Sequence, residues 1–129
     1  MKRSLRDLLT SWRSATFNPR DAAELVIQLD LSFVRARLKK EGWNQERLDH
    51  GEQEYRDFLI LLAQNPGQRL VPWCQTLDEF WHAHILHTRR YMQDCQRIFG
   101  RYLHHDPEIE RNPEVYRTAV DTTKSLLEE

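Results

Sequence analysis

The sequence predicts an all-α protein: a single-domain helical bundle over residues 1–129, with four long helices and a short amino-terminal one. Every long apolar pattern repeats at helical spacing, and none alternates as a half-buried strand does. The chain has 129 residues, the size of one ordinary domain. Hydrophobic residues make up 40% of it and include four tryptophans, which supply a core. Disordered and collagen-like classes are therefore excluded.

The amino-terminal segment predicts a short helix and carries a basic charge. Ser4 and Asp7 resemble a capping box, and leucines at helical spacing follow over residues 5–14. Residues 1–20 hold five basic side chains and one acidic one, whereas residues 106–129 hold seven acidic and three basic ones. We interpret this asymmetry as attraction between the two ends; the alternative is a basic arm for an acidic partner.

Two long helices are predicted in the first half of the chain. Pro19 follows a capping asparagine and opens a helix with two apolar stripes, which we expect to be central and to end at Gly42. Asn44 caps the next helix, which continues to about residue 64. Gly51 weakens that helix by up to about 1 kcal/mol without ending it.

Two more long helices are predicted in the second half. Thr76 opens a capping box, and the pattern predicts one uninterrupted helix over residues 77–99 that stops at Gly100. A loop then leads to Asn112, which caps a last helix beginning with a proline.

The helix predicted over residues 77–99 carries a group of candidate metal ligands. His82 and His84 point about 200° apart on a helix, so they cannot share one ion. Asp78 and His82 are four residues apart and can share one, although two ligands are too few for a site. The simpler interpretation is that Asp78 meets the positive end of the helix dipole and pairs with His82.

A second polar cluster, His104-His105-Asp106, lies in the loop after this helix. Loops are frequent sites of ligands and catalytic groups. The rise of a straight helix puts Gly100 about 27 Å along the axis from His82. Joining the two clusters therefore requires the loop to fold back along the whole helix.

His84 shares its arc of the helix with the apolar residues, so we expect it to be a buried core histidine. A buried imidazole needs a polar partner, and Asp30, on the central helix that begins at Pro19, is the predicted one. Cys74 and Cys95 are predicted to be free thiols, since a straight helix separates them by more than a disulfide spans. A cysteine nucleophile is the sharper alternative, but neither cysteine has a histidine three or four residues away.

The order of these residues resembles the core of the glycine-rich domain-containing protein-like family, most strongly over residues 71–107. The residues that carry it are Val71-Pro72, Leu77-Asp78, Trp81-His82-x-His84, Tyr91, Cys95, Phe99-Gly100 and His104-His105-Asp106-Pro107. The resemblance implies a helical domain in which Asp78, Trp81, His82, His84, Tyr91, Cys95 and Gly100 are marked positions, and it implies no reaction. Plant members carry glycine-rich tails, but this chain has only four glycines.

These observations favour a small cytoplasmic interaction or regulatory module with a protein partner and no cofactor; we assign no catalytic residue. The alternative is a metal-dependent or acid–base site, with zinc as the expected ion. It would use Asp78 and His82, or His84 with Asp30 or Glu54, and His104 and His105 are further candidate ligands. Nucleic-acid binding is not expected because the net charge is −1. No apolar run is long enough to span a membrane, and the charged amino end does not resemble a signal peptide.

Overall fold

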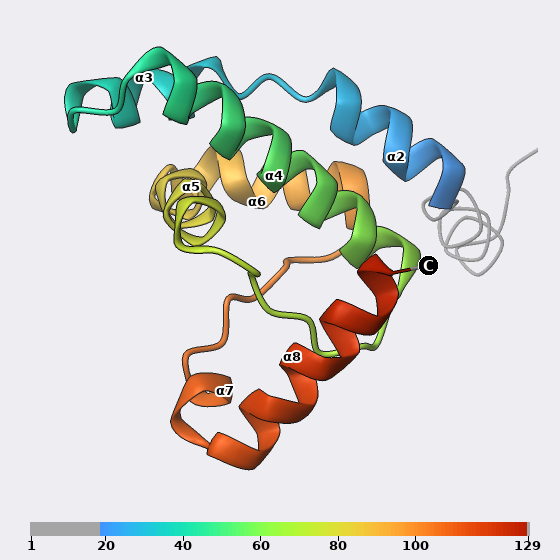
Figure 1. Cartoon of the computed structure of the whole chain (residues 1–129). Helices are drawn as coiled ribbons and strands as arrows, with labels where there is room; N and C mark the ends of the chain where they lie inside the picture. Colours follow the sequence, from blue (N-terminus) through green and yellow to red (C-terminus); the bar gives the residue numbers. More distant parts are fainter. Residues whose placement is uncertain (1–18, 129) are drawn as a thin grey trace, which may run out of the picture.

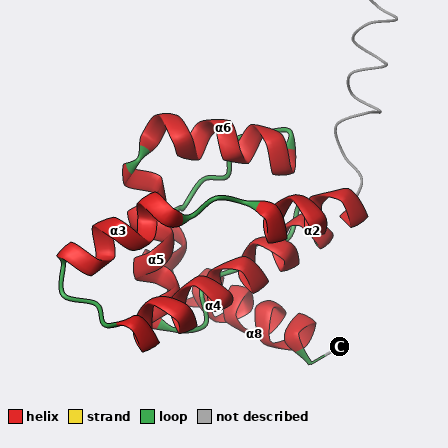
Figure 2. Cartoon of the chain, turned by 90° about the horizontal axis from the view of Figure 1, so that it is seen from above, coloured by secondary structure: helices red, strands yellow, loops and turns green. Residues whose placement is uncertain are grey.

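The computed structural model describes residues 19–128, and all the regular structure there is helical (Figure 1; Figure 2). The all-α class is confirmed, and the helix predicted over residues 5–14 lies outside the described residues. No helix in the described part is long and apolar enough to cross a membrane. The helices are α2 (Pro19–Gln28), α3 (Ser32–Lys40), α4 (Gln45–Gln64), α5 (Gln75–Leu86), α6 (Thr88–Phe99), α7 (Glu108–Arg111) and α8 (Pro113–Leu127).

The first long helix of the prediction is in fact two helices, α2 and α3, with a break between them. At the break, Asp30 accepts hydrogen bonds from the amide (2.9 Å) and the hydroxyl (2.6 Å) of Ser32. Arg56 of α4 donates to the carbonyls of Val26, Ile27 and Leu29 at the end of α2. The backbone groups released by the break are thus satisfied by side chains, one of them distant in sequence.

The helix predicted over residues 77–99 is also two helices, α5 and α6, which separate at His87. The His87 amide donates to the His84 carbonyl (3.0 Å), and the ψ angle of His87, 67°, is not helical. The Ala83 carbonyl, which an unbroken helix would pair with that amide, instead lies 2.9 Å from Nδ1 of the His87 ring. The histidine side chain therefore replaces the backbone bond that the break removes.

Two hydrogen bonds connect residues ten positions apart across this break. Trp81 Nε1 donates to the Tyr91 hydroxyl (2.9 Å), and His84 Nε2 lies 2.9 Å from Asp94 Oδ2. A straight helix would separate each pair by about 15 Å along its axis. These bonds form only because the chain bends at His87 and α6 leaves the axis of α5 (Figure 1).

The core lies mainly where α4 packs against α5, and Gly51 shows how close the contact is. A Cβ at Gly51 would lie 2.9 Å from Trp43 Cζ3 and 3.2 Å from Phe80 Cδ2. Glycine is needed here for space rather than being tolerated as a weak helix former. Tyr55, Phe58, Leu77 and Phe80 are fully buried around this contact.

Helix starts and ends are mostly where the caps predict them. Asn44 accepts from the Arg47 amide (2.8 Å), and Asn112 accepts from the first-turn amides of α8. Gly42 and Gly100 both have positive φ after a helix, as expected. The capping box predicted at Thr76 is wrong: α5 begins two residues after Trp73, at Gln75, without a side-chain cap.

The carboxy-terminal arm, α7 and α8, lies apart from α3 and α6 at the lower side of Figure 1. Its clearest link is Thr123, whose hydroxyl accepts from the Val71 amide (3.1 Å) and donates to the Ala119 carbonyl (2.7 Å). The loop between α6 and α7 runs back past α5 before it reaches this arm.

Candidate metal centre

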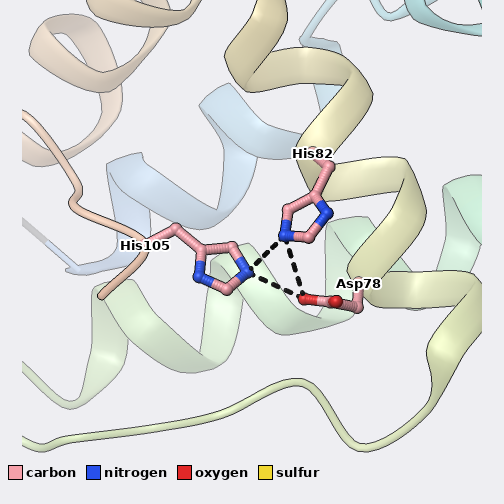
Figure 3. Close-up of side chains that lie close together, drawn as sticks. All are labelled: Asp78, His82 and His105. Carbon is pink, nitrogen blue, oxygen red and sulfur yellow. Dashed lines mark hydrogen bonds and ion pairs between the residues drawn. The ribbon is translucent and has the colours of Figure 1, made fainter. Parts of the chain in front are cut away.

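Three side chains that offer metal ligands converge at the start of α5 (Figure 3). Asp78 and His82 lie one turn apart on that helix, and His105 comes from the loop before α7. His105 Nε2 lies 2.8 Å from Asp78 Oδ1 and 2.9 Å from His82 Nε2. His82 Nε2 lies 3.6 Å from the same Asp78 oxygen. The three potential ligand atoms therefore form a small triangle.

The size of this triangle suits a transition-metal ion. Ligands at zinc-like distances of about 2.0–2.1 Å in tetrahedral geometry are separated by roughly 3.3 Å. The observed sides, 2.8, 2.9 and 3.6 Å, lie on both sides of that value. Two imidazoles and one carboxylate form a set used by zinc and by non-haem iron, and both ions then keep open positions.

The three side chains differ in exposure. His82 is 53% exposed and Asp78 28%, whereas His105 is only 14% exposed. The His105 ring stacks on the Trp81 indole, with centroids 4.1 Å apart and planes at 24°. The site is therefore shielded on the indole side and open on the His82 side.

The surroundings of Asp78 favour its ionised form. The hydrogen bond from His105 lowers the pKa of the Asp78 carboxyl below its usual value, partial burial opposes this, and nearby His82 and His105 reinforce it. At neutral pH the carboxylate can therefore bind a cation without first losing a proton.

Two grooves border the triangle. Asp78 lines one of about 260 Å³, together with Cys74 of the α5 cap and Tyr116 of α8. His82 lines another of about 420 Å³, with Arg47 and Leu86 among its walls. A small molecule in either groove would be next to a candidate ligand.

His84 does not belong to this site, although it is the buried histidine that the sequence predicts. It is 1% exposed. Its Nδ1 lies 2.7 Å from the Tyr55 hydroxyl, and its Nε2 lies 2.9 Å from Asp94. A neutral ring that carries its proton on Nε2 satisfies both neighbours, accepting from tyrosine and donating to the carboxylate.

The prediction that Asp30 is the partner of His84 is wrong. The Asp30 side chain is 65% exposed and lies 3.7 Å from Arg90. Because α2 and α3 are separate helices, Asp30 lies at the break, outside the core. The observed partner, Asp94, is missing from the prediction, although a carboxylate one turn after the buried Tyr91 is a signal of a polar contact on that face.

The remaining candidates lie elsewhere. Glu54 accepts from Trp73 Nε1 instead of meeting His84. His104 is exposed and packs against the Tyr102 ring, and Asp106 accepts from the Glu108 amide. Of the loop cluster, only His105 reaches the α5 pair.

His105 reaches Asp78 and His82 because the helix between them is not continuous. The predicted separation of about 27 Å assumed one straight helix. The break at His87 lets α6 leave the axis of α5, and the loop after Gly100 then runs back toward the start of α5 (Figure 1). Cys74 and Cys95 are both free thiols, as predicted, even though the helix used in that argument is broken.

Comparison with known proteins gives a family match and two weak relatives. The model of the UCP032817-like family matches residues 28–119. Glycine-rich domain-containing protein 1 of Arabidopsis thaliana is 32% identical over 62 residues, which are 46% of this chain and 8% of that protein. Glycine-rich domain-containing protein 2 of the same plant is 30% identical over 66 residues, 49% of this chain and 8% of that protein.

The chain thus spans less than a tenth of the length of these curated relatives. No solved structure matches it. The relatives' names agree with the resemblance found from the sequence, which is confirmed. The matched range of the family model includes all three residues of the triangle.

Proposed function

Because this chain belongs to the UCP032817-like family and its triangle lies inside the matched region, we propose that it is a helical metal-binding module. Asp78, His82 and His105 would hold one divalent transition-metal ion, with zinc as the first candidate. The observation that carries this proposal is the convergence of one carboxylate oxygen and two imidazole nitrogens within 3.6 Å of one another.

The chemistry of the donor atoms supports an ion at this point. His82 Nε2 and His105 Nε2 face each other, and only one of them can carry the hydrogen of the bond between them. When both rings are neutral, the other nitrogen therefore points a free electron pair into the triangle. A divalent ion accepts electron pairs from both nitrogens and from the carboxylate together. Three protein ligands leave a position for water, a small molecule or a partner's side chain.

Such an ion would support either of two roles. With water in the open position, it would act as a Lewis acid and lower the pKa of that water. With a partner's side chain there, it would join two proteins. The metal-dependent site that the sequence left as an alternative is thus our main proposal, now built on His105 as well as Asp78 and His82.

The test is metal binding by untagged protein, measured by elemental mass spectrometry and by titration with zinc. We expect one equivalent of tightly bound zinc in the wild type, and loss of most of the affinity in His82→Ala and His105→Ala. His104→Ala is the matched control, because it removes an exposed histidine from the same loop. Failure to bind a stoichiometric ion, or an equal loss in His104→Ala, would reject the proposal.

The interaction or regulatory role expected from the sequence is a second proposal. It is favoured by the groove beside His82, where the edge residue Leu86 is 59% exposed. A photo-crosslinker at position 86 should form a specific protein adduct that a chelator reduces, whereas one at exposed Lys124 should not. Equal labelling at both positions would reject this role. With either role we propose a cytoplasmic location, in keeping with two free cysteines.

A further inference from the structure

A tyrosine of α6 holds the backbone of the loop that supplies His105. The hydroxyl of Tyr91, on α6, donates to the Leu103 carbonyl at 2.6 Å. Leu103 lies two residues before His105, in a segment without helical structure. The same hydroxyl accepts a hydrogen bond from Trp81 Nε1 at 2.9 Å. Tyr91 thus connects α5 to the loop through a single oxygen atom.

Trp81 also contacts His105 directly. One face of its indole supports the His105 ring at 4.1 Å, while its N–H is used by Tyr91. Trp81 comes directly before His82 in the chain. The same turn of α5 therefore carries one candidate ligand, His82, and the indole that packs against another, His105. Both Trp81 and Tyr91 are nearly fully buried, at 3% and 1% exposure.

We propose that Trp81 and Tyr91 are positioning residues that hold His105 at the distance from Asp78 and His82 that a metal ion requires. Neither offers a ligand to the triangle; both act through His105. The effect on metal affinity rests on the proposed function, whereas the effect on the position of His105 does not. The proposal also gives a role to two residues of the sequence motif that the triangle leaves unexplained.

Tyrosine is required at position 91 because its oxygen must both accept and donate. Phenylalanine would keep the ring in the core but leave the Trp81 N–H and the Leu103 carbonyl without this partner. The loop would then keep the stacking contact, the bonds of His105 itself, the contact of the position-91 ring with Tyr102, and the backbone bond of Leu103 to Cys95. Because the loop lacks regular structure of its own, it would sample more positions.

Tyr91→Phe is therefore the test variant, with two Tyr→Phe controls. Tyr55→Phe removes another buried hydroxyl, the one bonded to His84, away from the loop. Tyr102→Phe alters an exposed tyrosine of the loop itself. Zinc affinity would be measured by competition with a chromophoric chelator. Chemical shifts of the His105 ring would be measured by NMR in metal-free protein.

We expect Tyr91→Phe to weaken zinc binding by about tenfold or more, the usual effect of removing support from a metal ligand. Both controls should stay close to wild type. In metal-free Tyr91→Phe, the His105 ring protons should lose the upfield shift caused by the stacked indole. Retention of that shift, or an equal loss of affinity in Tyr55→Phe, would overturn the proposal. If the wild type binds no metal, the proposed function fails, and the NMR shift alone decides whether Tyr91 positions His105.

Discussion

Replacement of His84 by alanine should destabilise the protein far more than replacement of His82, two residues away. His84 is 1% exposed and bonds to both Tyr55 and Asp94. Its ring also packs edge-on against Phe33 and Tyr91. Its removal takes away contacts that join α3, α4, α5 and α6.

The size of the effect follows from these contacts. The Tyr55 hydroxyl is wholly buried, so losing its acceptor costs about 1–3 kcal/mol, and the cavity adds about 1 kcal/mol or more. We expect His84→Ala to lower the free energy of unfolding by about 2–4 kcal/mol. His82 is 53% exposed, so without metal His82→Ala should cost less than about 1 kcal/mol.

Urea denaturation at pH 7, with a chelator and then with excess zinc, measures both effects. Zinc at about 100 times its dissociation constant should stabilise the wild type by about 2.7 kcal/mol. His84→Ala should keep most of that gain, and His82→Ala should lose it. Equal small losses for both variants in chelator would refute the inference that His84 links the helices. A zinc gain that survives in His82→Ala would refute its role as a ligand.

Three further predictions concern other parts of the molecule. Gly51→Ala should lower the free energy of unfolding by about 1–3 kcal/mol because the new methyl group meets Trp43, although alanine usually stabilises a helix relative to glycine. Thermal denaturation would measure the change, and a more stable variant would contradict the close contact. In native protein a thiol reagent should modify half-buried Cys74 well before Cys95, because burial raises the pKa of the Cys95 thiol. Mass spectrometry of the labelled peptides gives the order of reaction, and faster labelling of Cys95 would contradict its burial. Hydrogen bonds from Ser32 at the start of α3 lower the pKa of Asp30. The stabilising effect of Asp30 should therefore be present above the pKa it has in the unfolded chain and be lost as the pH falls through its lower pKa in the folded protein. NMR titration measures this pKa, and an ordinary value would argue against the hydrogen bonds to Ser32.

The local signals in the sequence determined the class of structure and most helix limits. Proline and asparagine fix starts by presetting φ or by accepting first-turn amides, as at Pro19, Asn44 and Asn112. Glycine fixes ends because it adopts positive φ without strain, as at Gly42 and Gly100. These effects act over a few residues, so the sequence alone contains them.

The two helix breaks were decided by tertiary structure. Neither break lies at a glycine or a proline: the first is the Leu-Asp-Leu segment between α2 and α3, and the second is at His87. The break before α3 is stabilised by Arg56, about 27–30 residues away in the chain. The break at His87 is stabilised by contacts across ten residues, which exist only once the helix has turned. Helical periodicity continues through both places, because it reports which face is apolar and not whether the axis is straight.

The candidate site divides in the same way. Four-residue spacing on a helix already brought Asp78 and His82 together. The third candidate ligand, His105, depended on the break at His87: a straight helix would place Gly100 about 27 Å from His82, whereas His105 lies at hydrogen-bonding distance from Asp78 and His82. Spacing along one helix is a local property of the sequence, whereas the loop's return is accompanied by long-range contacts, such as the Tyr91–Leu103 hydrogen bond, that exist only in the folded protein.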